Sequence, residues 1–403
     1  DRPGVLAMPG RHPAVVGNSV REIGGVRTAT VVPRSGRDAE DAMLAVVEEL
    51  FHVFWRKRHT NFRPDEMARF AYPLTDERNL RLILAEDEAL ARALEASALP
   101  QAAAWAAAAL RTRRERDPLL NDAERAFETG LEMLEGTANF VARTVVGQRP
   151  EATGARLRSE WPAEQIRWRF YNSGTAICFL LDRFSPGWKA EIDRDLDRTT
   201  VSLLEEALAR ADAKPAAFSE AELAAFGRRA AVAGGDLTAR REKLRDELAG
   251  RGGTRIVVEV ADGAEPLRVG RFDPIGLFVL DGGEVVHPGF LTLSAAGGTL
   301  EMTNPGFSRG SFAGTVAVTR GAGRHPLGEG IREVTIVAVK GTPRVGRDGG
   351  RLTIEAEGLR LSLPGAVLDA AQIDAPAIRM RAWLVVALDA ADLAEQMRRG
   401  AGA

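Results

Sequence analysis

Cysteine is almost absent from this chain. The 403 residues include a single cysteine, Cys178, which excludes an intramolecular disulfide and a cysteine-based zinc cluster. It lies in an apolar segment, where we expect a small buried side chain without a chemical role. Long apolar runs are missing too. No run reaches the roughly 18 residues that span a bilayer, so we expect no membrane span.

An excess of charge of either sign is also missing. The chain has 54 basic and 56 acidic side chains, a net charge of -2 and a pI near 6.3. This balance favours neither nucleic acid nor an anionic membrane as a partner. No GxSxG nucleophile elbow occurs, and the glycine-rich segment 321–330 lacks the Lys-Ser/Thr pair of a phosphate-binding loop. Neither a serine hydrolase nor a nucleotide-binding protein is therefore indicated.

The composition changes along the chain in a way that predicts its domains. An alternating pattern around Gly24-Gly25 predicts a β hairpin within residues 1–37. From residue 38 to 250 apolar residues recur at helical spacing, and after Gly250 short alternating runs predict strands. We therefore expect an α+β multidomain protein with a mainly helical domain over residues 1–250. An all-β domain, a sandwich or a barrel-like fold, is expected over residues 251–403.

The same patterns give individual elements. The hairpin strands are expected over 20–23 and 26–32. Helices are expected over 38–58, 76–98, 101–116, 119–146, 162–184, 198–211 and 219–249. Strands are expected over 254–260, 277–280, 290–293, 314–318, 333–339, 351–355 and 379–388. A short helix over 390–399 is expected to end the chain.

Three ionisable residues interrupt the apolar run Ala42–Trp55: Glu48, Glu49 and His52. A helix that is apolar on all faces is expected to be buried, and an unpaired carboxylate in a core costs on the order of several kcal/mol. These side chains therefore need partners. Positions 48 and 52 share a helix face, and Glu49 lies one residue round. One metal ion could satisfy all three residues, and a salt-bridged face without a metal is the alternative.

The segment Glu48-Glu49-Leu50-Phe51-His52, followed by Glu135-Gly136-Thr137-Ala138, resembles the HExxH…EGxA motif of the gluzincin metallopeptidases, with Glu in place of the first His. The resemblance implies a metal site made of Glu48, His52 and Glu135. It also implies Glu49 as the general base and Tyr171 as the group that stabilises the oxyanion. Zinc would be the cofactor and a peptide or protein the substrate. The resemblance covers residues 40–190 and leaves the β domain unexplained.

The substitution at position 48 changes the chemistry that we expect. A carboxylate in place of a neutral imidazole makes the ligand set harder and more anionic. We therefore predict weaker zinc binding, a less acidic bound water, and tolerance of manganese or magnesium. Phe140, where the family commonly has Tyr, is a second departure.

The alternative is a catalytically dead pseudopeptidase that binds other proteins. Its carboxylates would be neutralised by Arg56, four residues after His52, and by Arg143 on the stripe of Glu135. A protein partner would then dock on the β domain.

The remaining histidines show no ligand spacing. His59 is expected at the surface, and His12, His287 and His325 lie in turn-rich sequence. The chain begins at Asp1 without an initiator methionine, from which we expect a secreted or periplasmic bacterial protein.

Overall fold

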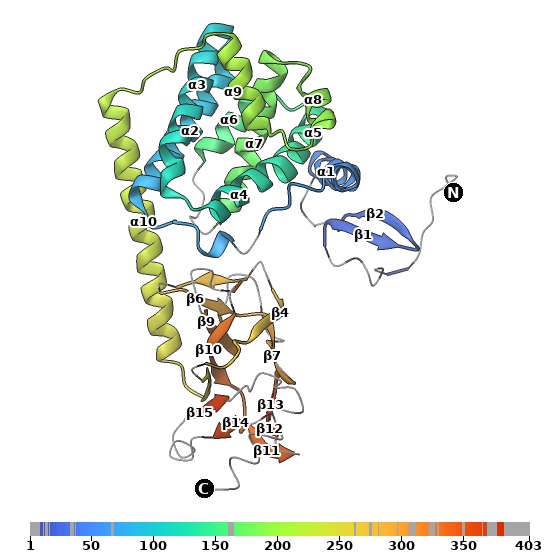
Figure 1. Cartoon of the computed structure of the whole chain (residues 1–403), viewed down its shortest axis with the longest axis vertical. Helices are drawn as coiled ribbons and strands as arrows, with labels where there is room; N and C mark the ends of the chain where they lie inside the picture. The colour runs from blue at the N-terminus through green and yellow to red at the C-terminus, as the bar shows by residue number, and fades with distance from the viewer. Residues whose placement is uncertain are drawn as a thin grey trace. The chain divides into compact units, whose positions relative to one another are not determined.

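The computed structural model divides the chain into two compact units, Asp1–Leu237 and Thr238–Ala403 (Figure 1). The first unit is a hairpin followed by helices, and the second is built of sheets. The structure describes residues 9–10, 12, 15, 17–32, 36, 38–65, 68–159, 165–261, 263–273, 276–280, 282–295, 297–304, 307, 312–321, 327–328, 330–348, 351–364, 366–368 and 377–382. The expected α+β multidomain architecture is confirmed.

The predicted hairpin consists of β1 (Ser19–Ile23) and β2 (Val26–Thr30), which pair antiparallel. Its turn residues Gly24 and Gly25 have φ angles of 58° and 78°. Positive φ at both central positions is the requirement of a type I′ hairpin turn of two residues, and glycine meets it without strain. Both strands contact helix α1 (Ala39–Arg58).

The helical part has a counterpart for every helix that we expected between residues 38 and 249. Its further elements are η1 (Ala68–Phe70), α2 (Glu77–Glu95), α3 (Leu99–Arg116), η2 (Asp117–Leu119), α4 (Asp122–Leu131), η3 (Glu132–Gly136), α5 (Thr137–Val145), α6 (Pro150–Arg158), α7 (Ile166–Phe184), α8 (Trp188–Arg194), α9 (Thr200–Arg210) and α10 (Glu220–Ala249). Helices α6 and α8 were not expected, because 9 and 7 residues are too few to show a helical period.

Helix α1 begins where the sequence indicates. The side chain of its N-cap Asp38 accepts a hydrogen bond from the backbone N–H of Asp41 at 2.8 Å, which satisfies one of the free N–H groups of the first turn. We expected this helix to be buried on every face. Instead one stripe is exposed, because α1 packs on one side only, against the hairpin and α5. The stripe consists of Met43, Val46, Leu50 and Phe54.

The segment expected as one helix over 119–146 is three consecutive pieces, α4, η3 and α5, and η3 is a turn of π-helix. A π turn shifts the helix face, and such turns are frequent at functional sites. It packs closely on α7. A Cβ atom added to Gly136 would lie 2.6 Å from the Cα of Gly174, so this contact requires glycine. The Gly of the EGxA segment thus has a packing role.

Helix α10 contributes residues to both units. Near its middle, a Cβ on Gly234 would lie 3.5 Å from the carbonyl oxygen of Thr75. Further along, Leu244 and Leu248 join an apolar cluster with strand residues such as Val286. The expected boundary at residue 250 follows the end of this helix, whereas the compact units divide at 237/238, because these leucines pack on the β unit.

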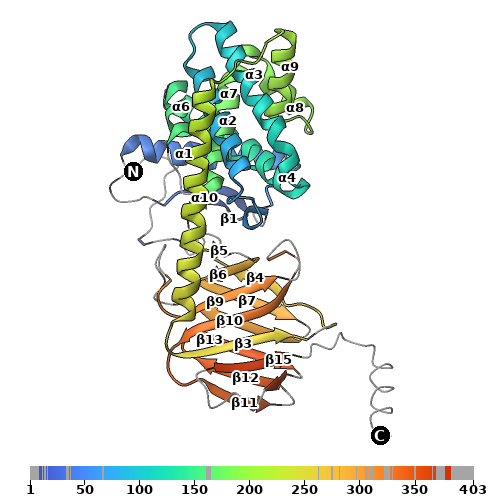
Figure 2. The ribbon, with the colours of Figure 1, turned by 90° about the vertical axis from the view of Figure 1, so that its left-hand side faces the viewer.

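The second unit contains two sheets, which lie in layers (Figure 2). The first has the order β14-β15-β3-β10-β9-β6-β5, and the second β11-β12-β13-β8-β7-β4. All pairings are antiparallel except that of β15 with β3. An isolated bridge between Leu267 and Ile331 links the sheets. The strands are β3 (Thr254–Val260), β4 (Arg268–Phe272), β5 (Phe278–Val279), β6 (Glu284–His287), β7 (Phe290–Ala295), β8 (Gly298–Thr303), β9 (Val316–Gly321), β10 (Ile331–Val339), β11 (Arg344–Asp348), β12 (Arg351–Ala356), β13 (Leu359–Pro364), β14 (Ala366–Leu368) and β15 (Ala377–Ala382).

Every expected strand has a counterpart, but β4, β6, β8, β11, β13 and β14 were missed. Two of these strands, β4 (RVGRF) and β11 (RVGRD), contain glycine and arginine in succession, which interrupts the alternation of apolar and polar residues and hides the period. The predicted helix over 390–399 lies outside the described residues. Among the helices that the structure describes, none is long and apolar enough to cross a bilayer.

Candidate metal centre

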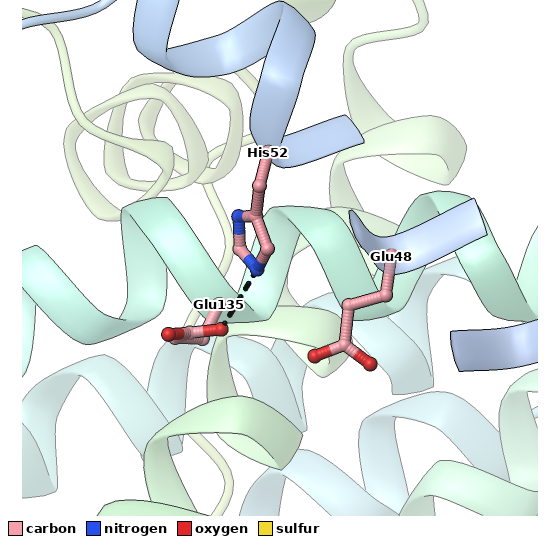
Figure 3. Close-up of side chains that lie close together, drawn as sticks. All are labelled: Glu48, His52 and Glu135. Atoms are coloured by element: carbon pink, nitrogen blue, oxygen red, sulfur yellow. Dashed lines mark ion pairs between the residues drawn. The ribbon is translucent and has the colours of Figure 1, made fainter. Parts of the chain in front are cut away.

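Glu48, His52 and Glu135 lie together, as the motif predicted. Glu48 and His52 extend from α1 toward Glu135 on η3 (Figure 3). The Nε2 atom of His52 is 3.1 Å from Oε2 of Glu135. One donor atom from each of the three residues lies within 4.8 Å of the others. Two carboxylates and an imidazole at this spacing could hold a divalent metal ion.

His52 and Glu135 shift each other's pKa in the direction that favours the ionised forms. Burial acts to lower the pKa of His52, but the hydrogen bond and the charge of Glu135 outweigh burial, so this pKa is raised. Burial acts to raise the pKa of Glu135, yet His52 and Arg167 outweigh it, so this pKa is lowered. The imidazolium and the carboxylate therefore stabilise each other. The Nδ1 atom of His52 is buried and has no hydrogen-bond partner in the described part of the chain.

The pKa of Glu48 is shifted in the opposite direction to that of Glu135. Burial raises its pKa to about 7, and the charge of Glu135 adds to the shift while His52 opposes it. Arg143 attracts Glu48 only weakly, because its guanidinium donates instead to Thr153 Oγ1 at 2.8 Å and to Asn172 Oδ1 at 2.9 Å. Glu48 is thus a largely desolvated carboxyl group that forms no ion pair with an arginine or lysine in the described part of the chain.

Glu49, the expected general base, lies beside the same cluster and is 8% exposed. Burial raises its pKa, with Glu135 adding to the shift and with His52 and Arg56 opposing it. A carboxyl group whose pKa moves toward neutrality is suited to accept and return a proton near pH 7. Arg56 thus acts on Glu49 through its charge.

Tyr171, the expected oxyanion group, points its phenol at Glu135. The two side chains are within hydrogen-bonding reach, which lowers the pKa of Glu135. Burial raises the pKa of Tyr171 well above its ordinary value, and the charge of Glu135 adds to this shift. Tyr171 therefore stays protonated and is a hydrogen-bond donor at the centre.

Arg167 is a site residue that the sequence reasoning missed. Its Nη2 atom lies 2.9 Å from Oε1 of Glu135, and its guanidinium lies over the ring of Tyr171, 5.2 Å from the centroid. The only signal in the sequence was its position four residues before Tyr171 on one helix. Among the described residues, Arg167 forms an ion pair with Glu135, whereas Arg56 and Arg143 act on Glu49 and Glu48 through their charge.

One of the remaining histidines lies elsewhere than expected. His59 was expected at the surface, but it is 3% exposed. Its ring stacks on Trp55 with centroids 3.9 Å apart, and its Nε2 atom lies 3.1 Å from Oδ1 of Asp193. The stack follows from the i, i+4 spacing at the end of α1. Phe140 packs in the core, edge-on to Phe179 with centroids 5.0 Å apart.

A cavity of about 500 Å³ opens beside Glu135. We call it the arginine-lined cavity, because the hairpin, the end of α1 and the following segment, and α7 each contribute arginine to it. It is lined by Val20, Arg21, Glu22, Arg27, Trp55, Arg56, His59, Phe62, Arg63, Pro64, Leu134, Glu135 and Arg167.

A buried charge network lies on the other side of η3. Its members are Glu86, Asp87, Arg113, Arg116, Glu128, Glu132 and Arg169. Arg113 donates to Oε1 and Oε2 of Glu132, both at 2.7 Å. Burial raises the pKa of Asp87 to about 7 despite the nearby Arg169. Protonation of Asp87 would leave three carboxylates against three arginines, which balances the charge.

No protein-family model matches this chain. No curated protein and no solved structure matches it either. The resemblance to gluzincins therefore depends on the residues of the candidate centre alone.

Proposed function

We propose that the protein is a metal-dependent peptidase related to the gluzincins, with an atypical ligand set of Glu48, His52 and Glu135. The observation that carries this proposal is the convergence of one donor atom from each residue within 4.8 Å. These residues come from segments more than eighty positions apart, in the order of the HExxH…EGxA motif. Zinc is the proposed metal, and the two carboxylates make manganese or magnesium acceptable alternatives.

The roles of the side chains follow from their positions. A bound metal would polarise the scissile carbonyl and acidify a water molecule. Glu49 would take the proton of that water and pass it to the leaving amine. Tyr171 would donate a hydrogen bond to the developing oxyanion. Arg167 would orient Glu135 through their 2.9 Å contact, as a partner of a ligand does.

Metal content after purification without chelator or histidine tag tests the proposal, with Glu135→Gln as the diagnostic variant. We expect near-stoichiometric metal by plasma mass spectrometry, and loss of most of it in the variant. Glu151→Gln changes a half-buried carboxylate on α6 that lies outside the centre and pairs with Arg149 at 3.3 Å; it is the matched control and should keep the metal. Absence of metal after loading with zinc and manganese would refute the ligand set.

Peptide cleavage is the second arm of this experiment. Glu49→Gln should retain the metal and lose activity by about 10²–10⁴-fold, the range typical of a general base. Loss of both metal and activity would assign Glu49 to metal binding instead.

The rival function is a pseudopeptidase that binds proteins, and one observation favours it. Both oxygens of Glu135 already have cationic partners, His52 on Oε2 and Arg167 on Oε1. Ion pairs could therefore hold the ligand helix without a metal. The β unit offers this rival a surface groove of about 650 Å³ near Lys340 and Arg344. Metal-free protein that stays folded and inactive with every metal would favour this function.

A further inference from the structure

The arginine-lined cavity carries more positive than negative charge, in a protein whose net charge is -2. Five arginines line it, against the carboxylates of Glu22 and Glu135. Glu135 is already paired with Arg167, and Glu22 lies opposite Arg27 in the hairpin register. The excess is local. The low-dielectric walls of a cavity concentrate the electric field of the charges that line it, so this excess of positive charge attracts anions.

The arginines left over are Arg21, Arg56 and Arg63. Within the part of the chain that the structure describes, none of them forms an ion pair with a carboxylate at 4.0 Å or less. Arg21 donates to the hydroxyl of Ser19, at 3.1 Å. They come from a strand, a helix and a connecting segment, so the tertiary structure gathers them. A guanidinium group binds a carboxylate through two parallel N–H donors, which is a geometry that arginine favours over lysine.

The cavity also reaches the metal centre. Leu134, Glu135 and Arg167 form part of its wall, and Glu135 is a proposed metal ligand. Its volume of about 500 Å³ falls in the range of about 300–1,000 Å³ typical of ligand sites. Trp55 and Phe62 supply apolar wall, which suits the side-chain stem of an amino acid.

We propose that the arginine-lined cavity is a substrate subsite that binds an acidic residue of a peptide next to the metal centre. This inference rests on the proposed function, because it names the substrate class of the same site. The carboxylate of a glutamate or aspartate would contact Arg56 and Arg63, and its methylene groups would lie against the aromatic wall. The protein would thereby select acidic peptides over neutral ones.

Calorimetric titration of the chelator-treated, full-length protein tests the inference without any turnover. The probes are a blocked hexapeptide with two central glutamates, the same peptide with glutamines, and inorganic phosphate. We expect the acidic peptide to bind about tenfold more tightly than the neutral one at low salt, as charge-assisted guanidinium contacts provide, and the preference to weaken with added salt.

The variant Arg56→Gln/Arg63→Gln should abolish this preference while leaving the fold intact, because both side chains are exposed. Lys57→Gln/Arg58→Gln removes the same charge from neighbouring exposed positions outside the cavity and should keep the preference. Equal affinity for both peptides, or the same loss in both double variants, would overturn the inference. Phosphate that binds more tightly than the acidic peptide would also overturn it, in favour of a free anion site.

The outcome is separable from that of the proposed function. Selective binding of the acidic peptide by metal-free protein supports the subsite even if no metal or activity is found. Cleavage of acidic and neutral peptides with equal kcat/KM would overturn the subsite and leave the peptidase proposal standing.

Discussion

Two groups of buried charge share the π turn η3, and their carboxylates are compensated by cations in different ways. On one side, Glu132 is held by two hydrogen bonds from Arg113, both 2.7 Å. On the other side, Glu135 is paired with His52 and Arg167, while the adjacent Glu48 makes no ion pair within the described chain. Each carboxylate of the first group is paired with an arginine, whereas Glu48 in the second group has no such pair among the described residues.

The pKa shifts express this difference. Burial acts to raise the pKa of Glu86, but Arg113, Arg169 and Arg116 outweigh it, and the pKa is lowered. At Glu48 burial prevails and the pKa is raised to about 7. The comparison teaches that burial alone does not decide the ionisation of a carboxyl group, because the surrounding cations oppose it. Three arginines outweigh burial at Glu86, whereas Arg169 alone does not outweigh it at Asp87. In the network the cation is arginine, and at Glu48 the position of a cation is open to a metal.

Arg116→Met should give the largest effect on stability, because it removes a cation from the group in which each carboxylate is paired with an arginine. Arg116 is 0% exposed and donates to Glu128 Oε2 at 2.8 Å and to Glu86 Oε2 at 3.2 Å. Its loss leaves buried carboxylates undercompensated, which costs about 3–5 kcal/mol of unfolding free energy. Urea denaturation followed by tryptophan fluorescence reports on the helical unit, since five of the six tryptophans precede residue 238.

The matched control for this change is Arg114→Met, two residues earlier on α3. Arg114 is 59% exposed on its side chain and pairs with Glu205 at 2.9 Å. A surface pair of this kind contributes about 0–1 kcal/mol. Equal losses for the two variants would show that the network is as hydrated as the surface.

Gly136→Ala should disturb the element that both groups share. The added methyl group would lie 2.6 Å from the Cα of Gly174, so η3 and α7 must move apart, at a cost of about 1–3 kcal/mol. Metal binding should weaken together with stability, because Glu135 is the preceding residue. Gly235→Ala, with no atom within 4 Å of its new Cβ, is the control and should stabilise α10 by about 0.5–1 kcal/mol. Retained stability in Gly136→Ala would contradict the packing role of this glycine.

The sequence predicted the fold well where local patterns are long. The amphipathic runs of α2 and α7 extend over 19 residues each, and their periods were visible. The π turn η3 was not predicted. It packs closely against Gly174 of α7, and such a tertiary contact leaves no local signal in the sequence. Strands such as β6, with 4 residues, are fixed by pairing with neighbours that are distant in sequence.

The sequence predicted the three proposed metal ligands, but it did not predict the side chains that contact them. The spacing of Glu48 and His52 places them on one face of α1 whatever surrounds it. The contacts of Arg167 and the burial of His59 depend on how α7 and the 188–194 region fold against α1. Such tertiary contacts have no period in the sequence, so Arg167 and the arginine-lined cavity emerge only from the structure.

Glu48→Gln should give the smallest effect on stability. It tests directly the carboxyl group that is not paired with an arginine. A carboxyl group whose pKa rises from 4.5 to about 7 on folding reduces stability as pH rises through that interval, and the full loss is present above pH 7. The full shift corresponds to about 3 kcal/mol, which partial solvent screening reduces to about 1–2 kcal/mol. In chelator we therefore expect the variant to exceed the wild type in unfolding free energy at pH 8 and to match it at pH 4.

Glu40→Gln, on the exposed first turn of the same helix, is the control for this change and should show no such pH-dependent gain. Saturating zinc should reverse the sign at Glu48, because a bound cation stabilises the wild-type carboxylate and not the amide. Denaturation at pH 8 with and without zinc measures both the gain of the variant in chelator and its reversal by zinc. A gain in chelator that zinc leaves unchanged would mean that Glu48 is a strained buried acid and not a ligand, and the ligand set would then reduce to His52 and Glu135.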